Sequence, residues 1–565
     1  MSCIHLFLPK HCFCLLASLS VCQLLVLKFD APASAEFNSL IATTPQNQAI
    51  AQTKPPTDNT QNAAPVEVPI SIKRIDIVGS TILTPNQIDQ LTSPLIGKSA
   101  TISQISEIAD KITKIYQENN FITSRAFLPP QDIKDGVVKI QVLEGKIERI
   151  DIGRAGKVDG RLNDNYIRDR IALGATHPLN FTNIEEKLQL LRADPLVADI
   201  KANLISGSTP DQNIVNVTLS EAKTFSVNTF IDNYGNTSSG IFRVGATVQE
   251  ANLTGNGDSI YLSYTRSGSS DNYSLGYFYP INPMGGTLGF NFSTGQSPVT
   301  EPPFNTLNIS TNTQTFELAY RQPIVRSLTE EFTLGVGFTF GNSSSFLDGE
   351  SFNFQNLLFD DGNSQTRVLN LNQEYIRRDN SGAWALRSSF NFGLGMLGAT
   401  IRNDNSPDGR FFYWVGQLLR VQRLGEDKDT LATFRFNLQL AGDSLLSSNR
   451  FSIGGPQSVR GYRQSQLVGD NGIQSSLEIQ IPAVRDLEGI PIVKVLPFME
   501  AGAIWNARNN NFGNQSLLGI GLGAIYQPSR NFTFRLDYGI PLINAGNPYT
   551  NLQDSGMYFS VSGNF

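Results

Sequence analysis

The alternation of hydrophobic and polar positions first becomes regular at residue 70. The segment SIKRIDIVGS alternates apolar and polar residues and predicts a strand that ends at Gly79. Thr84 and Pro85 then start a predicted helix, with threonine as the cap and proline in the first turn. A second helix is predicted from Thr101, because Gln104 stands at capping-box spacing. Its apolar positions follow the helical period: Ile105, Ile108, Ile112 and Ile115.

This order of elements occurs twice. The strands SRAFLPP and GVVKIQVLEG close the first unit, and KIERIDIGRAG then repeats the Arg-Ile-Asp-Ile core of SIKRIDIVGS. The elements predicted next are helices at 163–173 and 182–193, then strands at 198–205 and 213–221. A repeat of about seventy-five residues predicts two small α+β modules, 70–145 and 146–222. One continuous α+β domain is the alternative, and the repeated strand start counts against it.

After Lys223 the helical period disappears and one alternating segment follows another. LATFRFNLQL is typical, with phenylalanine and leucine on one face and Arg435, Asn437 and Gln439 on the other. Segments of about ten such residues, separated by Gly, Asn, Asp and Ser turns, are what a membrane β-barrel requires. In lipid every backbone polar group must find its partner within a closed sheet. Residues 223–565 are therefore predicted to form a transmembrane antiparallel β-barrel of about 16 strands.

A large soluble β-sandwich also has alternating strands, and three features count against it. The inward-facing set includes charged residues, as a wet lumen would, and aromatic residues recur at strand ends (Tyr273, Tyr277 and Tyr279). The third feature is the N-terminal signal described next. The last strand, GMYFSVSGNF, ends on Phe565 and resembles the signal that barrel-insertion machinery reads, so this machinery is an expected partner.

Residues 1–35 have the form of a secretory signal peptide, with a basic start, a short apolar core and a small-residue cleavage site ending at Ala35. Ala49-Ile50-Ala51 offers a weaker second site. A membrane anchor is the alternative, but the apolar run is short and contains Ser and Gln. Residues 36–69 are rich in Gln, Asn, Thr, Ala and Pro, which predicts a flexible linker.

The composition of the chain argues against several kinds of partner and functional site. The formal net charge of −6 argues against a nucleic-acid partner. All four cysteines lie in the predicted signal peptide, and after its removal His177 is the one histidine left. Metal sites built on Cys and His, thiol nucleophiles and Ser-His triads thus lose their required residues. We expect no catalytic residue, metal or cofactor and no enzyme activity, although a paired-carboxylate hydrolase is not excluded by this argument.

The glycine-rich segment GGPQSVRGY lies in a long connection between two strands, residues 444–472. Such a long loop is usually functional or disordered. If it folds into the barrel, Arg460 enters a partly desolvated lumen and needs a carboxylate partner. Gly461 would permit the turn and Tyr462 would pack beside it. The alternative is that the arginine simply faces water.

The next strand, VKVLPFMEAGAIW, offers that partner. Alternation places Met499 toward lipid and Phe498, Glu500 and Gly502 toward the lumen. An Arg460–Glu500 pair would tether the loop tip to the barrel wall. Pro497 lacks an N–H and predicts a bulge or a late start of the strand.

Two modules, a barrel and GGPQSVRGY together resemble the two-partner secretion transporters (TpsB family). These are the outer-membrane exporters of haemolysin- and filamentous haemagglutinin-type proteins. FLPPQDIKDGVVKIQVLEG resembles the end of the first module of that family, a polypeptide-transport-associated (POTRA) domain, and DNYGNTSSG its first barrel hairpin. The family's Arg-Gly-Tyr loop motif maps onto Arg460, Gly461 and Tyr462. Its F-x-D-x-G strand motif maps onto Phe498, Glu500 and Gly502, with Glu in place of Asp at position 500.

The resemblance implies a pore that exports a large β-rich exoprotein across the outer membrane, with POTRA modules in the periplasm that recognise the unfolded client by its N-terminal secretion domain. Some relatives plug the pore with an N-terminal helix, which the proline-containing segment 36–69 does not predict. A barrel assembly or insertion factor of the same superfamily is the first alternative, and its usually larger number of modules distinguishes it. A passive porin would leave 70–222 unexplained, and an outer-membrane enzyme would lack the Cys and His noted above.

Overall fold

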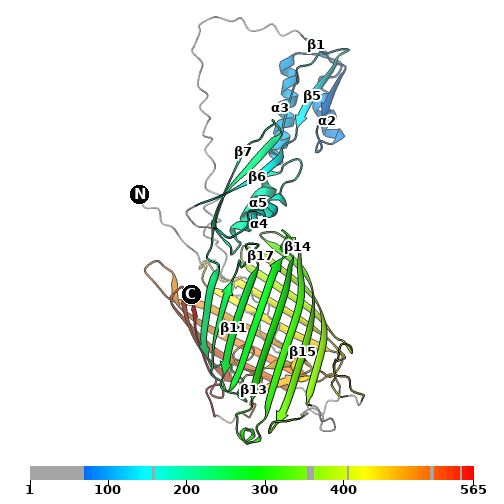
Figure 1. The fold of residues 1–565 in the computed structure, drawn as a ribbon. Coiled ribbons are helices and arrows are strands. Elements are labelled where there is room, and N and C mark those ends of the chain that lie inside the picture. Colours follow the sequence, from blue (N-terminus) through cyan, green and yellow to red (C-terminus); the bar gives the residue numbers. More distant parts are fainter. Residues whose placement is uncertain (1–68, 156–159, 353–361, 404–405, 509–514, 547–549) are drawn as a thin grey trace. The chain divides into compact units, whose positions relative to one another are not determined.

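The computed structural model describes residues 69–155, 160–352, 362–403, 406–508, 515–546 and 550–565. The predicted signal peptide and the linker up to residue 68 lie outside these residues. The described chain divides into two compact units (Figure 1). One unit holds the two three-stranded sheets and most of the helical residues that precede Glu221, and the other holds the barrel together with residues 160–166. None of the described helices is long and apolar enough to cross a membrane.

The first sheet of the N-terminal unit has the strand order β2-β5-β4, with β2 parallel to β5. Thr101 and Gln104 form the predicted capping box at the second helix. Thr84 caps the first helix as predicted, and Gln87 completes a capping box there that the sequence interpretation did not include. The second helix buries Ile105, Ile108 and Ile112 of the predicted stripe, whereas Ile115 is half-buried and Tyr116 takes the next core position. The elements are β1 (Ile70–Ser71), β2 (Arg74–Val78), α2 (Pro85–Thr92), β3 (Ser99–Ala100), α3 (Ile102–Glu118), β4 (Arg125–Phe127) and β5 (Val137–Leu143).

The second sheet repeats this arrangement, with the order β6-β8-β7 and β6 parallel to β8. Both strands that carry the Arg-Ile-Asp-Ile core, β2 and β6, thus pair in parallel with the last strand of their own repeat. The elements are β6 (Lys146–Arg154), α4 (Asp164–Ala172), α5 (Phe181–Arg192), β7 (Val197–Ser206) and β8 (Gln212–Glu221).

The barrel is a closed antiparallel ring of 16 strands, which confirms the predicted fold class. The last strand pairs with the first, so the ring has no free edge. Its strands are β9 (Phe225–Asp232), β10 (Arg243–Glu250), β11 (Ser259–Ser267), β12 (Ser270–Pro280), β13 (Thr287–Pro298), β14 (Ser310–Arg326), β15 (Glu330–Leu347), β17 (Asn363–Asp379), β18 (Gly382–Gly393), β19 (Phe411–Arg423), β20 (Leu431–Ala441), β23 (Asn471–Arg485), β24 (Pro491–Trp505), β25 (Gln515–Ser529), β26 (Phe532–Pro541) and β27 (Met557–Asn564). The short elements β16 (Glu350–Ser351) and η1 (Phe304–Leu307) belong to the connections.

The two ends of the barrel differ in the length of their connections. We call the end at which β9 begins proximal and the opposite end distal. Proximal turns are short, such as 380–381 and 530–531, whereas distal connections include 394–410 and 442–470. Short turns at one end and long loops at the other are characteristic of outer-membrane barrels, whose short turns face the periplasm.

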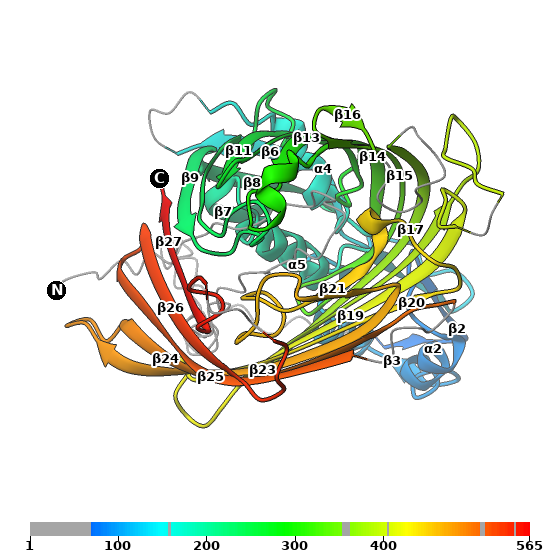
Figure 2. The same cartoon turned by 90° about the horizontal axis from the view of Figure 1, so that it is seen from below.

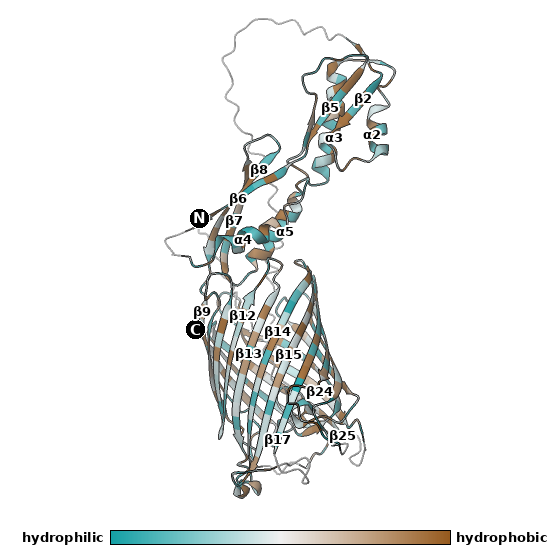
Figure 3. Cartoon of the chain, turned by 45° about the vertical axis from the view of Figure 1, so that its right-hand side comes forward, coloured by the Kyte–Doolittle hydropathy of each residue, from teal (hydrophilic) through white to brown (hydrophobic). Residues whose placement is uncertain are grey.

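Hydrophobic and hydrophilic residues follow one another in short steps along the barrel strands (Figure 3). On β26, Phe534 and Leu536 are exposed on the outer wall while Asp537 is buried within the barrel. On β24, Met499 is exposed outside and Glu500 is buried inside, which is the predicted alternation. Pro497 does not delay the start of β24. The ladder to β23 is interrupted at this proline, which lacks an N–H, but the ladder to β25 continues through it.

The connection after β20 runs through residues 442–470 and lies inside the ring of strands (Figure 2). We call it the lumen loop. It contains η2 (Ser447–Asn449), β21 (Phe451–Ile453) and β22 (Leu467–Gly469), and β21 pairs with β22. The flanking strands end and begin two residues earlier than the predicted limits of 444–472. Leu445 and Leu446 continue the apolar character of β20, but both are buried in the loop.

Candidate functional site

The lumen loop holds its tip by glycine turns and a small apolar core. Gly454, Gly455 and Gly461 have φ angles of 110°, 91° and 101°, in the region that other residues rarely adopt. The core consists of Phe451, Ile453, Val459 and Tyr462 from the loop and Ile504 and Leu517 from the barrel wall. Gly502 faces Ile453 so closely that a Cβ at this position would lie 3.1 Å from its side chain. The segment before Arg460 is therefore packed against the wall.

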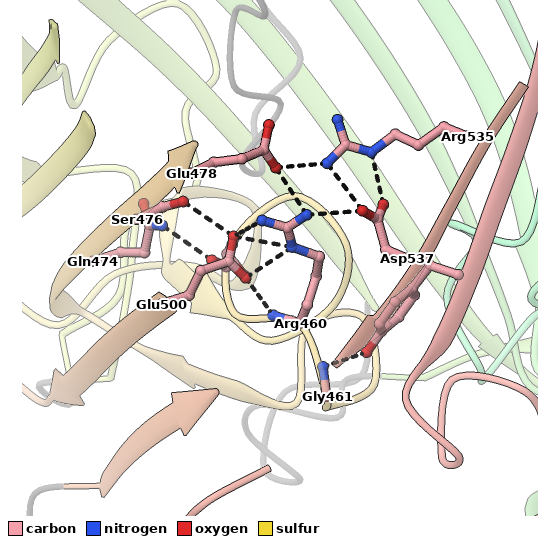
Figure 4. A network of polar contacts seen from close by, with 10 residues as sticks. Arg460, Gly461, Gln474, Ser476, Glu478, Glu500, Arg535 and Asp537 are labelled. Atoms are coloured by element: carbon pink, nitrogen blue, oxygen red, sulfur yellow. Dashed lines mark hydrogen bonds and ion pairs between the residues drawn. The ribbon is translucent and has the colours of Figure 1, made fainter. Parts of the chain in front are cut away.

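Arg460 and Glu500 are in direct contact, as the pairing predicted from the sequence requires (Figure 4). Arg460 Nη2 lies 2.6 Å from Glu500 Oε1, and Nε lies 3.1 Å from both carboxylate oxygens. The backbone N–H of Arg460 donates to Oε2 at 2.7 Å. The Arg460 and Glu500 side chains are only 2% and 4% exposed. Glu500 thus holds both the guanidinium and the backbone of the loop tip.

Two further carboxylates bind the same guanidinium. Arg460 Nη1 lies 3.0 Å from Glu478 on β23 and 3.0 Å from Asp537 on β26. Arg535 on β26 bridges these two acids, at 2.7 Å from each. The guanidinium carbon also lies 3.3 Å from the centre of the Phe498 ring, a cation–π arrangement. One loop residue is thus bound to three strands of the wall.

The loop tip also lies against backbone that only glycine leaves open. A Cβ at Gly519 would lie 2.2 Å from the carbonyl oxygen of Arg460, and one at Gly539 would lie 2.5 Å from the nitrogen of Gly461. A Cβ at Gly521 would lie 2.4 Å from the Phe498 ring. Glycines on β25 and β26 therefore leave the space in which the loop tip lies. We call Gly519, Gly521 and Gly539 the glycine seat.

Gly461 and Tyr462 complete the attachment. The N–H of Gly461 donates to the hydroxyl of Tyr558 at 2.9 Å, and that hydroxyl donates to the carbonyl of Tyr462 at 2.6 Å. The Tyr462 hydroxyl lies 2.8 Å from the carbonyl oxygens of both Leu518 and Ile543. At the other end of the sequence, Phe565 pairs with Val227 of β9 through two backbone hydrogen bonds of 2.9 Å. The C-terminal residue thus takes part in closing the ring.

Besides the glycines, Glu478, Arg535, Asp537 and Tyr558 contribute to this site and were not identified as site residues from the sequence. The sequence contains part of the information needed to identify these residues. Arg535 and Asp537 share the polar face of NFTFRLDYGI, and Glu478 shares a face with Ser476 in the strand IQSSLEIQ. A charged residue that alternation places inside a barrel needs a partner, and these strands surround β24. Closure of the ring, which brings β27 near the loop, had no such local signal.

A second set of contacts holds the loop near the distal end. Arg463 forms ion pairs with Asp554, in the connection after β26, and with Glu301, in the connection after β13. The Asp554 side chain is fully enclosed, and Arg463 Nη1 lies 2.6 Å from Glu301. The hydrogen bond to Asp554 raises the pKa of the Arg463 guanidinium. We call these three residues the distal latch.

Replacing Arg463 with alanine is expected to loosen the distal latch while the Arg460 contacts persist. Asp554 would lose its cation in an enclosed position, so its loop should move away from the lumen loop. We expect a rise of about two- to fivefold in the ionic conductance of the barrel in planar bilayers, since the loss of a partly buried charged pair costs about 1–3 kcal/mol. Arg463→Lys, which retains the charge, is the control, and unchanged conductance of the alanine variant would contradict the latch.

The described part of the chain contains no group of three or more His, Cys, Asp or Glu residues arranged to hold a metal ion. In the cluster around Arg460, the acids Glu478, Glu500 and Asp537 are already bound by arginine side chains. The arrangement is suited to holding a loop inside a pore, since the three ion pairs of Arg460 join the loop tip to the wall and Arg535 braces two of their acids within the wall.

Comparison with known proteins assigns the chain to a family. The family described as "Haemolysin secretion/activation protein ShlB/FhaC/HecB" matches residues 211–526, and the ShlB-type POTRA domain matches residues 70–145. The outer membrane transporter CdiB of Dickeya dadantii is 22% identical over 488 residues, covering 84% of this chain and 83% of CdiB. The heme/hemopexin transporter protein HuxB of Haemophilus influenzae is 25% identical over 429 residues, covering 68% of each chain.

The fold agrees with a solved relative. CdiB from Escherichia coli superposes with a TM-score of 0.67 at 19% identity, covering 91% of this chain and 93% of that one. Members of the matched family transport secreted exoprotein clients by two-partner secretion. The chain therefore belongs to the haemolysin secretion/activation family, the outer-membrane transporters of two-partner secretion, with its barrel in the outer membrane and its POTRA region in the periplasm.

Proposed function

We propose that this transporter exports one large β-rich exoprotein, which its N-terminal unit binds unfolded in the periplasm and which folds outside the cell. The Arg460 cluster carries the proposal, because it ties a loop inside a barrel that is otherwise a continuous pore wall. The chain acts as a conduit and has no catalytic role. Neither a nucleotide nor a membrane potential is required, since folding of the client outside supplies the driving force.

Residues 146–222 are the second POTRA module in this proposal. The repeated Arg-Ile-Asp-Ile core and the shared strand order of the two sheets support this assignment. With two modules the chain fits an exporter better than a barrel assembly factor, which usually carries more.

The client would bind by adding a strand to a free sheet edge of these modules. In the order β6-β8-β7 both β6 and β7 are edges, and β7 is ten residues long. An exposed edge offers unpaired N–H and C=O groups to an extended peptide. In the client, this peptide would belong to the N-terminal secretion domain, which is rich in strands. The same recognition by backbone hydrogen bonds explains how a module can bind a chain before that chain has folded.

The remaining partners follow from the outer wall and the C-terminus. The apolar outer face contacts outer-membrane lipid. The barrel-assembly machinery is proposed to insert the chain by recognising β27 and its terminal Phe565.

Co-expression tests the function directly. A haemagglutinin-type exoprotein with a matching secretion domain, ideally one encoded beside this gene, is expressed in a bacterium that lacks both proteins. We expect the client in the medium only when this transporter is present. Client retained in the periplasm by a correctly inserted barrel would contradict the pairing, and loss of other barrels from the outer membrane would then favour an assembly factor.

A further inference from the structure

The lumen has two unlike walls. The wall formed by β20, β23, β24, β25 and β26 carries the charges Arg435, Glu478, Glu500, Arg535 and Asp537, and it carries the glycine seat of the lumen loop. We call it the loop wall. It is occupied, because the hydrogen bonds of Arg460 and Tyr462 run to these strands and to the segment that follows β26.

The opposite wall, β11 to β18, is different in its distal half. Most of its inward positions there are glycine or small hydroxyl and amide side chains, such as Thr313, Thr315, Thr339, Asn370, Ser389 and Asn391. Val368 is an apolar exception, which packs against Leu445 of the lumen loop. No inward side chain on these strands, in the part that the structure describes, is charged between the middle of the barrel and the distal end. We call this surface the neutral wall.

The neutral wall forms hydrogen bonds within itself. Thr339 donates to Asn370 at 3.0 Å, and Asn370 donates to Asn391 at 2.7 Å. Glu317 marks the proximal limit of the neutral wall, and its carboxylate accepts a hydrogen bond from Asn291 at 3.3 Å. The proximal third of these strands holds ion pairs again, with Arg321 lying 2.7 Å from Glu374.

We propose that the neutral wall is the track along which the extended client crosses the membrane, while the loop wall serves to hold the lumen loop. This proposal rests on the export function proposed above and adds which surface the client contacts. The ligand is a polypeptide backbone with few charged side chains.

The chemistry of the two walls explains the choice. A chain in transit must keep its N–H and C=O groups hydrogen-bonded as it leaves water. Hydroxyl and amide groups both donate and accept, so they can serve either backbone group at any register. A charged wall would bind charged residues of the client much more strongly and delay them. Conduction requires contacts that are favourable enough for entry and weak enough for exit, and many neutral hydrogen bonds meet this requirement.

Disulfide trapping tests the track in the full-length transporter. The four cysteines, all in the predicted signal peptide, are replaced by alanine, and one new cysteine is introduced per variant. Thr315→Cys places it on the neutral wall, and Ser560→Cys places it on an inward position of β27, beside the loop wall. The probe is a haemagglutinin-type client with cysteines along its chain and a tightly folded C-terminal domain that stalls it in the pore.

We expect at least tenfold more adduct with the client from Thr315→Cys than from Ser560→Cys. Equal yields, or a reversed order, would overturn the track while export by the parent barrel continued. If the parent barrel exported no client at all, both the track and the export function would be overturned.

A charge on the track gives an independent readout. Thr339→Lys is expected to slow export at least fivefold, whereas Thr339→Ser should export normally. Both variants must first migrate as inserted, heat-modifiable barrels. Normal export by an inserted Thr339→Lys barrel would count against the neutral wall as the client's path.

Discussion

Alanine in place of Arg460 is expected to reduce export to a few per cent or less while leaving the barrel in the outer membrane. The guanidinium is the common partner of Glu478, Glu500 and Asp537, and the Arg460 side chain is only 2% exposed. Removing one partner from a buried ion pair costs about 3–5 kcal/mol, because the remaining charge has no partner. In the variant the loop tip should leave its seat. The strands themselves keep every ladder bond.

The measurement combines client secretion with heat-modifiability on gels, which reports insertion. Arg460→Lys is the matched control. It keeps one positive charge but cannot bind two carboxylates in the planar, forked geometry of arginine, so we expect intermediate export. Export at the parental level by an inserted Arg460→Ala barrel would show that the tether has no part in transport.

Alanine in place of Gly519 is also expected to reduce export, in this case because the loop tip is displaced sterically. The added methyl group would lie 2.2 Å from the carbonyl oxygen of Arg460, which is closer than two such atoms can approach. All charges of the cluster are preserved. Gly519 lies within the regular ladder of β25, so alanine there meets no backbone strain of its own. The loop tip must shift, and we expect export to fall about tenfold, consistent with an overpacking cost of about 1–3 kcal/mol.

The control for this variant is Ala524→Val on the same strand, which adds volume on the outer, lipid-facing side. It should insert and export as the parent does. Proteolysis from outside the cell provides a second readout, since a displaced lumen loop should be cut faster in the Gly519→Ala barrel. Normal export together with an unchanged cleavage rate would refute the glycine seat.

Glutamate at position 500 preserves the pairing despite its extra methylene. The longer side chain reaches both the guanidinium and the backbone N–H of Arg460. The Oγ of Ser476 donates to it at 3.0 Å, which fixes the carboxylate from the β23 side. The difference from the family's aspartate thus leaves the contact in place in this chain.

The sequence by itself predicted the element types and, among the contacts of Arg460, the pair with Glu500. Period-two alternation separates lipid-facing from lumen-facing residues without knowledge of the fold, which is why Glu500 and Met499 could be assigned to opposite sides. The caps at Thr84 and Thr101 depend on residue types within a few positions, so both helix starts could be read directly.

Only the tertiary structure decided which inward-facing charges meet. Glu478, Asp537 and Arg535 carry the right alternation, but their distance from Arg460 depends on the order and stagger of strands around a closed ring. The same holds for Tyr558, which reaches Gly461 because β27 closes on β9 and brings the end of the chain beside the loop. Alternation is a local property of the strand, whereas a contact across the lumen is set by closure of the whole barrel.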